Sequence, residues 1–228
     1  MRSDDRMEVT RDVVPVPVAG GDGRGAAFQV RIHGRGGQGV VAAAEILSMA
    51  AFDEGRYAQA FPSFGSERMG APVVSYCRID DRPIRTHEPI TEPDALVVQD
   101  ATLVHQVDVF AGLSDGAFVL VNTSKSFEDL GLVDLAARLG PDRAVTCPAT
   151  ALALEHLGRP LPNAALLGGF AALTGRVSLG ALEKAMGERF PGPAGVANAT
   201  AARAAYGVVA DQVRLVRDRG VVTGAAAD

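Results

Sequence analysis

The chain has 228 residues, of which 47% are hydrophobic and 21% charged, and its formal net charge is −5. This length suffices for one α/β domain with a substantial core, and the acidic balance argues against a nucleic-acid-binding protein, for which a basic face is expected. No apolar run approaches the ~20 residues of a membrane span and no secretory signal is visible, so we expect a cytoplasmic protein.

The first 26 residues combine mixed charges, prolines and a glycine-rich run. This composition is typical of a flexible leader, and it predicts at most one edge segment at 13–18. We expect the remainder, 27–228, to form a single α/β domain.

A glycine-rich stretch at 34–39 lies between a predicted strand at 28–32 and a predicted helix at about 38–54. The strand is apolar and β-branched, and the helix contains strong helix formers and stops at a glycine. Unpaired N–H groups and the helix dipole favour an anion at such a junction, and glycine lets a ligand approach closely. The turn therefore predicts a phosphate-binding site, with a tight packing turn as the alternative.

The G-x-G-x-x-G spacing within 34–39 also fits the dinucleotide-binding fingerprint. That interpretation requires a second buried strand that ends in an acidic residue about 20 positions further on. The offset falls here on Asp53 and Glu54, at the end of the helix, and residues 57–62 do not have the pattern of a buried strand. The phosphate-binding interpretation is retained, and the NAD interpretation is disfavoured.

Further strands and helices alternate along the rest of the chain. Strands are predicted at 72–79, 95–99, 118–121 and 143–146, and helices at 102–111, 150–157, 163–174, 178–189 and 198–217. Ser178 and Asn198 are the predicted N-caps of the last two helices. Several strands end in small polar residues, as parallel strands do at a ligand crevice. The pattern predicts a three-layer α/β fold: a mostly parallel sheet, helices on both faces and a helical C-terminal part.

Only two cysteines are present, Cys77 and Cys147, and both lie in apolar strand-like segments. Two thiolates cannot supply the four ligands of an iron–sulfur cluster, so we expect buried free thiols. The histidines are isolated and have no metal-ligand spacing. His33 lies beside the glycine turn, but lone histidines are more often structural, and none is assigned a catalytic role. No metal site is predicted.

Residues 34–39 (GRGGQG) and 57–73 (YAQAFPSFGSERMGAPV) together form a far more specific pattern than either does alone. They resemble the gamma subunit, or gamma domain, of the 2-oxoacid:acceptor oxidoreductases, and most of all the pyruvate:ferredoxin type. Ser66 and Met69 depart from the usual proline and frequent arginine of that pattern. These departures leave the fold assignment intact and the 2-oxoacid undetermined, with pyruvate favoured over other aliphatic or aromatic oxoacids.

The resemblance continues at 78–85, 92–94 and 163–169, and it covers about residues 28–205. It implies a complex that decarboxylates a 2-oxoacid on thiamine diphosphate, passes electrons through 4Fe-4S clusters and transfers the acyl group to coenzyme A. In this family the alpha and beta subunits hold thiamine diphosphate and Mg²⁺, and the clusters lie mainly in beta and in a ferredoxin-like delta subunit. Ferredoxin or a similar carrier accepts the electrons. The gamma subunit contributes coenzyme A handling and assembly, so this chain is expected to be inactive alone.

Two groups of residues follow as site candidates, and none of them is expected to be catalytic. The first is the glycine turn at 34–39, and the second is the segment 63–68. Arg35 either pairs with a phosphate or is a solvated turn residue. Glu67 and Arg68 are expected to dock on the catalytic subunits, the alternative being a local ion pair worth at most about 1 kcal/mol. The candidates for coenzyme A binding are Gly34, Arg35, Gly36, Gly37, Gln38, Gly39, Ser63, Phe64, Gly65 and Asn122.

Two other functions remain open on the sequence. The first is an independent NAD(P)-dependent dehydrogenase that uses the glycine turn. The second is a nucleotide-binding regulatory module with no enzyme attached. The complex stoichiometry and the individual coenzyme A contacts do not follow from the sequence.

Overall fold

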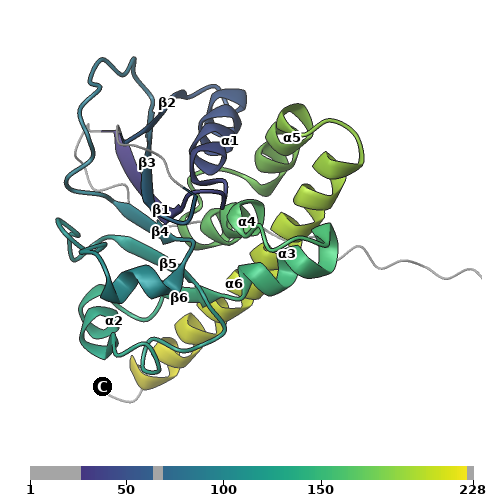
Figure 1. Cartoon of the computed structure of the whole chain (residues 1–228). Helices are drawn as coiled ribbons and strands as arrows, with labels where there is room; N and C mark the ends of the chain where they lie inside the picture. The colour runs from purple at the N-terminus through teal and green to yellow at the C-terminus, as the bar shows by residue number, and fades with distance from the viewer. Residues whose placement is uncertain (1–26, 64–68, 225–228) are drawn as a thin grey trace, which may run out of the picture.

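A computed structural model of the chain describes residues 27–63 and 69–224, which include one mixed six-stranded sheet (Figure 1). The strand order is β2-β3-β1-β4-β5-β6. β3 is antiparallel to both of its neighbours, whereas β1, β4, β5 and β6 pair in parallel. The strands are β1 (Phe28–Arg35), β2 (Tyr57–Pro62), β3 (Pro72–Asp80), β4 (Ala95–Val98), β5 (Phe118–Asn122) and β6 (Ala144–Cys147).

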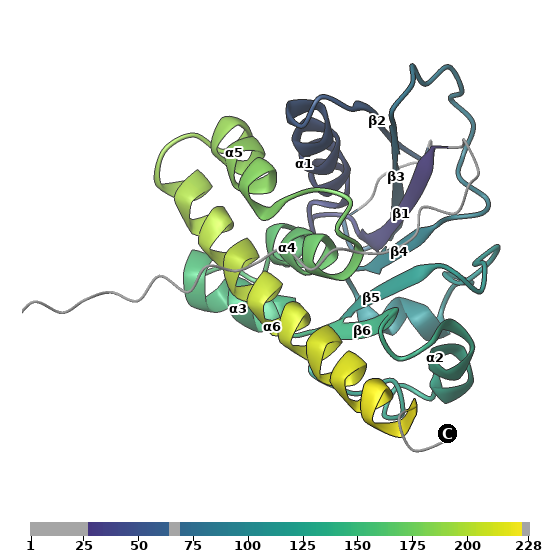
Figure 2. The ribbon, with the colours of Figure 1, turned by 180° about the vertical axis from the view of Figure 1, so that it is seen from behind.

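Helices cover the two faces of the sheet unequally. One face carries α1 and the C-terminal helices, and the other carries η1 and α2 over β4 and β5. Figures 1 and 2 show α4 enclosed by its neighbours and α6 running as a long diagonal across the outside. The helices are α1 (Val40–Asp53), η1 (Ala101–His105), α2 (Val133–Leu139), α3 (Ala149–Leu157), α4 (Asn163–Thr174), α5 (Leu179–Arg189) and α6 (Pro193–Gly224).

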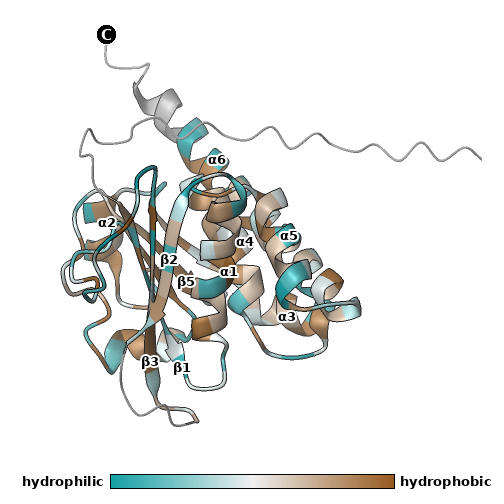
Figure 3. Ribbon diagram, turned by 90° about the horizontal axis from the view of Figure 1, so that it is seen from above, coloured by the Kyte–Doolittle hydropathy of each residue, from teal (hydrophilic) through white to brown (hydrophobic). Residues whose placement is uncertain are grey.

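The central strands alternate between two hydrophobic clusters. On β4, Ala95 and Val97 pack toward α1 and α4, while Leu96 and Val98 pack toward η1. Side chains on a strand alternate between its faces, so a strand that is apolar at every position must be covered on both sides. In Figure 3, β3 and β5 are mainly hydrophobic, whereas β2 carries hydrophilic residues along part of its length.

α4 is buried on nearly all sides because two consecutive glycines let its neighbours approach. A Cβ on Gly168 would lie 1.9 Å from the carbonyl oxygen of Ala202 on α6. A Cβ on Gly169 would lie 3.1 Å from Val209 and 3.3 Å from Leu120 on β5. The backbones of α4 and α6 can therefore be this close only if residue 168 has no side chain.

The predicted fold class and the predicted strands from residue 28 onward are confirmed, but three segments differ from expectation. Residues 57–62 do form a strand, β2, which lies at the sheet edge and is only partly buried, so its pattern was not that of a core strand. The helix predicted at 102–111 is instead a 3₁₀ turn at 101–105, capped by Asp100. Helix α2 at 133–139 was not predicted, because it is short and only its last residue is buried.

One of the two predicted N-caps is confirmed. The Ser178 side chain accepts a hydrogen bond from the N–H of Ala181 at the start of α5. The prediction for Asn198 was wrong, because α6 begins at Pro193 and the Asn198 amide donates to the Ala194 carbonyl inside the helix. Proline is over-represented at the first helical position, so Pro193 was the available start signal. The leader and its segment at 13–18 lie outside the described residues.

Cys77 and Cys147 are buried free thiols, as predicted. Burial raises the pKa of each thiol to about 12. Across residues 27–63 and 69–224, no helix is both long and apolar enough to cross a membrane. The same residues contain no group of three or more histidine, cysteine or acidic side chains arranged to hold a metal ion.

The close approach of α4 and α6 yields a stability prediction. Gly168→Ala is expected to lower the free energy of unfolding by about 1–3 kcal/mol or more, because backbone atoms on α6 must move to admit the methyl group. Urea denaturation of the full chain followed by circular dichroism measures the change.

The matched control is Gly187→Ala on α5, where a Cβ would meet nothing within 4 Å. Alanine has the higher helix propensity, so this variant should gain about 0.5–1 kcal/mol. Equal stabilities for the two variants would contradict the assigned role of Gly168.

Candidate functional site

The glycine turn connects the end of β1 at Arg35 to the start of α1 at Val40. Gly37 has φ +94° and Gly39 has φ +74°, in the left-handed region that favours glycine. Gly39 occupies the N-cap position of α1 and offers no capping side chain. The turn therefore depends on glycine for its path and leaves the helix N-terminus open.

The first backbone hydrogen bond of α1 runs from the N–H of Ala43 to the carbonyl of Gly39, 2.9 Å. The N–H groups of Val40, Val41 and Ala42 precede it, and they donate to no acceptor within the described part of the chain. Unpaired N–H groups and the positive end of the helix dipole together favour a bound anion. Backbone N–H groups are therefore available to an anion at this turn, and phosphate binding here stays a prediction.

The turn also lies where the sheet topology opens a crevice. After β1 the chain crosses one face through α1 toward β2, whereas after β4 it crosses the opposite face through η1 toward β5. The connections therefore diverge at the carboxyl ends of two adjacent parallel strands. Such a switch point is the usual ligand position in open α/β sheets.

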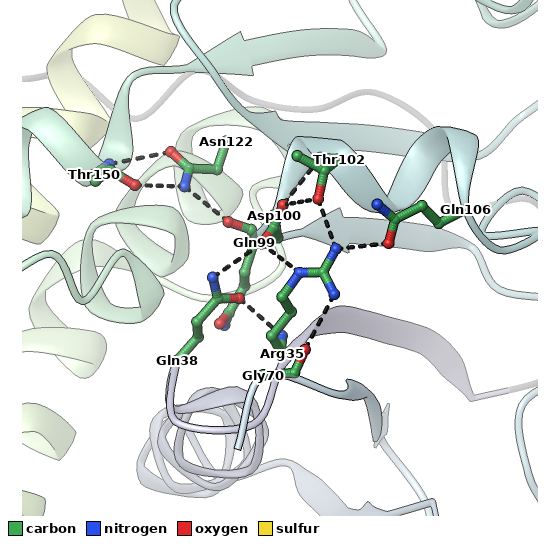
Figure 4. Close-up of polar contacts among 9 residues, drawn as sticks. All are labelled: Arg35, Gln38, Gly70, Gln99, Asp100, Thr102, Gln106, Asn122 and Thr150. Atoms are coloured by element: carbon green, nitrogen blue, oxygen red, sulfur yellow. Dashed lines mark hydrogen bonds and ion pairs between the residues drawn. The ribbon is translucent and has the colours of Figure 1, made fainter. Parts of the chain in front are cut away.

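Arg35 is the centre of a polar network at this edge (Figure 4). Its Nε donates to Asp100 Oδ2 at 2.8 Å, and the two side chains are only 23% and 17% exposed. Its terminal nitrogens donate to the Gly70 carbonyl, Thr102 Oγ1 and Gln106 Oε1. Arg35 is thus neither the solvated turn residue nor a free cation. Whether it also contacts a phosphate stays a prediction, but the geometry gives it a positioning role.

The carboxyl of Asp100 is stabilised in its charged form. Partial burial alone would raise its pKa, but hydrogen bonds from Thr102 and then from Arg35 outweigh this, and the pKa lies below its ordinary value. The ion pair therefore persists at neutral pH. Because the pair is neutral overall, attraction of an anion at this edge falls to the α1 backbone.

Gln38 holds the turn from within. Its Oε1 accepts from the Arg35 N–H at 2.8 Å, and its Nε2 donates to Asp100 Oδ2 at the longer distance of 3.3 Å. In addition, the Gly36 N–H donates to the Ala71 carbonyl, which fastens the turn to the start of β3. The Gln38 amide is thus engaged by protein groups, and its predicted contact with coenzyme A stays a prediction.

Gln99 is the residue at this edge that sequence reasoning missed. Its side chain is 1% exposed, and neither its amide nitrogen nor its oxygen has a partner within the described residues. Its backbone is anchored: the N–H donates to the His33 carbonyl at 2.7 Å, and the carbonyl accepts from Asn122. An unpaired buried polar group costs about 1–3 kcal/mol and needs an explanation. The available signal was a glutamine directly after the apolar run 95–98.

Asn122 lies at the end of β5, beside Gln99, and is fully used by the protein. Its Oδ1 accepts from the Thr150 N–H, and its Nδ2 donates to Thr150 Oγ1 and to the Gln99 carbonyl. It thereby joins β4, β5 and the start of α3. Asn163 at the start of α4 reaches back to the Gly39 carbonyl at 3.5 Å. The contacts of Asn122 place its carboxamide at the carboxyl edge of the parallel strands, where the sequence predicted a ligand crevice, and give it a structural role.

The second candidate group is only partly described. Ser63 is exposed just after β2, and its N–H donates to the Val74 carbonyl. The chain returns at Met69, which forms a bridge with Gly36 beside the turn. Met69 therefore lies beside the glycine turn. The predicted residues Phe64, Gly65, Glu67 and Arg68 lie outside the described residues.

His33 is buried on the sheet face opposite α1. Burial, with a smaller contribution from the nearby Arg31 charge, lowers the pKa of His33 to about 4. The imidazole is therefore neutral at physiological pH and has no positive charge to offer a phosphate. This agrees with the structural role expected for a lone histidine.

The side chains present fit some cofactors and not others. Two buried, mutually unbonded cysteines do not fit an iron–sulfur cluster, which requires four ligands. The glycine turn fits a phosphate-bearing ligand, because α1 presents unpaired N–H groups and Gln99 supplies an unpaired buried amide. These groups can bind and orient such a ligand through hydrogen bonds.

Comparison with known proteins supplies the context of this site. Residues 29–208 match the family model described as pyruvate ferredoxin/flavodoxin oxidoreductase. The chain is 50% identical over 179 residues to pyruvate synthase subunit PorC of Methanothermobacter thermautotrophicus, covering 78% of this chain and 94% of that one. It is 51% identical over 179 residues to the pyruvate/ketoisovalerate oxidoreductases common subunit gamma of Thermococcus kodakarensis, with 78% and 95% covered.

A solved structure agrees with the sequence relatives. The crystal structure of pyruvate oxidoreductase subunit PORC from Thermotoga maritima matches with a TM-score of 0.68 and 37% identity. The match covers 79% of this chain and 96% of that one.

The Arg35–Asp100 pair yields a prediction with a pH dependence. Because the pKa of Asp100 is depressed in the folded state, its stabilisation is present above the unfolded pKa of about 4 and is lost as pH falls through the lower folded value. Asp100→Asn should therefore cost about 1–3 kcal/mol at pH 7 and clearly less near pH 3. Urea unfolding at both pH values measures the difference.

Asp115→Asn is the control, since Asp115 is 82% exposed and lies 3.7 Å from Arg138. An exposed pair contributes little, so this variant should change stability by less than about 1 kcal/mol at either pH. A penalty for Asp100→Asn that does not vary with pH would refute the ionic contribution.

Proposed function

Because this chain belongs to the pyruvate ferredoxin/flavodoxin oxidoreductase family, we propose that it is the gamma subunit of a 2-oxoacid:acceptor oxidoreductase complex. The complex oxidatively decarboxylates a 2-oxoacid, pyruvate in the favoured case, to an acyl-coenzyme A. Support comes from relatives near 50% identity that are almost fully covered by the match and are named as PorC or gamma subunits.

Within this complex, the proposed role of the chain is to bind and orient coenzyme A. The observation that carries this role is the open N-terminus of α1, where Val40, Val41 and Ala42 present unpaired N–H groups beside the glycine turn. A phosphate of coenzyme A is an anion of the kind that such groups bind. When bound, coenzyme A supplies the thiol that accepts the acyl group.

The remaining cofactors are proposed to lie on other chains. Thiamine diphosphate with Mg²⁺ is assigned to alpha and beta subunits, and the 4Fe-4S clusters to beta and a ferredoxin-like delta subunit, with ferredoxin or a similar carrier as acceptor. The two buried thiols and the missing acidic or histidine cluster of the described residues support this division. Under this proposal the redox centres of the complex are carried by the other chains.

The topology speaks against the NAD(P)-dehydrogenase alternative. In the dinucleotide fold the second strand lies parallel beside the first and ends in an acidic residue that binds the ribose. Here β3 lies antiparallel between β1 and β2, and β2 ends at Pro62, followed by Ser63. An acidic side chain is thus missing from the position where the ribose would need it. No observation favours the regulatory-module alternative over the family assignment.

Assembly provides the first test of the proposed function. Co-production with candidate alpha, beta and delta chains should give a complex that forms acyl-coenzyme A, whereas this chain produced alone should be colourless and inactive. Visible absorbance and coenzyme A-dependent acceptor reduction are the measurements. Cluster absorbance in the pure single chain, or failure to associate with any of these chains, would contradict the assignment.

Gly37 provides the residue-level test. A Cβ at this exposed position would approach the Sδ of Met69 to 2.8 Å, a flexible and 86% exposed neighbour that can move aside. Gly37→Asp places a carboxylate beside the N–H groups of α1, where it repels a phosphate and competes for its donors. The KM for coenzyme A in the assembled complex should rise by at least about tenfold, equivalent to ~1.4 kcal/mol.

Gly37→Asn is the matched control, because asparagine has the same size and the same tolerance of positive φ but no charge. It should raise the KM much less than Gly37→Asp does. Thermal unfolding of both complexes separates a binding defect from a folding defect. Identical kinetics for the two variants, or a loss of folded protein alone, would rule out phosphate binding at this turn.

A further inference from the structure

Gln99 differs from the other carboxamides at the carboxyl edge of the sheet. Gln38 and Asn122 use both their oxygen and their nitrogen in hydrogen bonds to protein groups. Gln99 is 1% exposed and uses neither atom within the described residues. The fold thus fixes the Gln99 backbone firmly, between His33 and Asn122, while leaving its side chain without a partner.

The position of Gln99 ties it to the glycine turn. The point where a Cβ on Gly34 would lie is 3.2 Å from Gln99 Cβ, 3.1 Å from Gln38 Oε1 and 2.6 Å from Val40 Cγ2. The base of the Gln99 side chain therefore lies close to Val40, the first residue of α1. Figure 4 shows its side chain running past Gln38. It lies on the sheet face that α1 covers, since Ala95 and Val97, with the same alternation, pack there.

The hydrogen-bonding groups of the Gln99 carboxamide determine which ligand group could pair with it. The carboxamide presents one acceptor oxygen and two N–H donors in a plane, and another amide group complements both at once. A phosphate offers acceptors only and would leave the Gln99 oxygen unpaired. The only ionic side chains in the Arg35 network are Arg35 and Asp100, which neutralise each other. The surroundings therefore suit a neutral polar group.

We propose that Gln99 is a specificity-determining residue that binds an amide group of the ligand whose phosphate lies at the α1 N-terminus. This inference rests on the proposed function, in which that ligand is coenzyme A, because its pantetheine arm carries secondary amides. The backbone of α1 selects for the charge of the ligand, and Gln99 selects for its neutral arm.

The contact requires a neighbouring side chain to move, because both Gln99 amide atoms are closed to solvent. Gln38 is the neighbour that we assign to this movement. Its Nε2 contact with Asp100 is the longest of its hydrogen bonds, at 3.3 Å, and Asp100 keeps its bonds to Arg35 and Thr102 without it. In the proposed binding step, Gln38 gives up this hydrogen bond and moves aside, so that the ligand reaches the Gln99 amide.

The test is Gln99→Met in the assembled complex, which keeps the side-chain length and removes both hydrogen-bonding groups. The KM for coenzyme A should rise about tenfold, and the inhibition constant of pantetheine should rise by a similar factor. Inhibition by adenosine 3′,5′-bisphosphate, which has the phosphates but no amide, should not change. The melting temperature should not fall, because the variant removes a buried amide that has no protein partner.

Asn198→Leu is the control for removing a buried amide elsewhere. Asn198 is 7% exposed, and it bonds to Ala194 within α6. This variant should lower the melting temperature and leave the KM for coenzyme A unchanged. It shows what a purely structural amide does, so the opposite pattern for Gln99→Met identifies a ligand contact.

Two failures can be told apart. If Gly37→Asp weakens coenzyme A but Gln99→Met does not, the amide contact is refuted while coenzyme A binding at the turn stands. If neither variant affects coenzyme A, the proposed function of the turn fails as well. If Gln99→Met weakens adenosine 3′,5′-bisphosphate instead of pantetheine, Gln99 contacts the nucleotide end and the inference is wrong.

Discussion

The hydrogen bonds of one guanidinium group hold the site together. Arg35 at the end of β1 joins the glycine turn to η1 and to Gly70, which precedes β3, through hydrogen bonds to Asp100, Thr102, Gln106 and the Gly70 carbonyl. The planar donors of arginine suit such a junction, because several acceptors can be fixed at once. The open start of α1 can then present unpaired N–H groups to a ligand, because other contacts hold the turn.

The fold was predictable where local pattern and tertiary role agree. The apolar strands and the C-terminal helices have strong periodicity and clear glycine or proline boundaries, and the structure confirms them. Residues 57–62 lack the pattern of a buried strand, as predicted, but they still form β2, because an edge strand is buried on one side at most and needs no continuous apolar run. The helix predicted at 102–111 fails because Asp100 caps a 3₁₀ turn, and this local hydrogen bond is not visible as periodicity.

The candidate site was likewise predictable only in its local features. The glycine turn is a local feature, and positive φ at Gly37 and Gly39 explains why glycines were required. The engagement of Arg35 and Gln38 depends on Asp100, about sixty-five residues away in the sequence. Gln99 was missed for the same cause, since its unpaired amide exists only once β1, β4 and β5 are assembled. Sequence spacing identifies a turn, but only packing shows which of its side chains are still available.

The two buried thiols have a practical consequence. Cys77 and Cys147 are fully enclosed, and their pKa of about 12 leaves almost none of the reactive thiolate at neutral pH. Alkylating reagents and spin labels that attack thiolates will therefore pass over both residues in the folded chain. A cysteine introduced at an exposed position becomes a unique attachment point without removal of the native thiols. The movement of single segments can then be followed in an otherwise unmodified subunit.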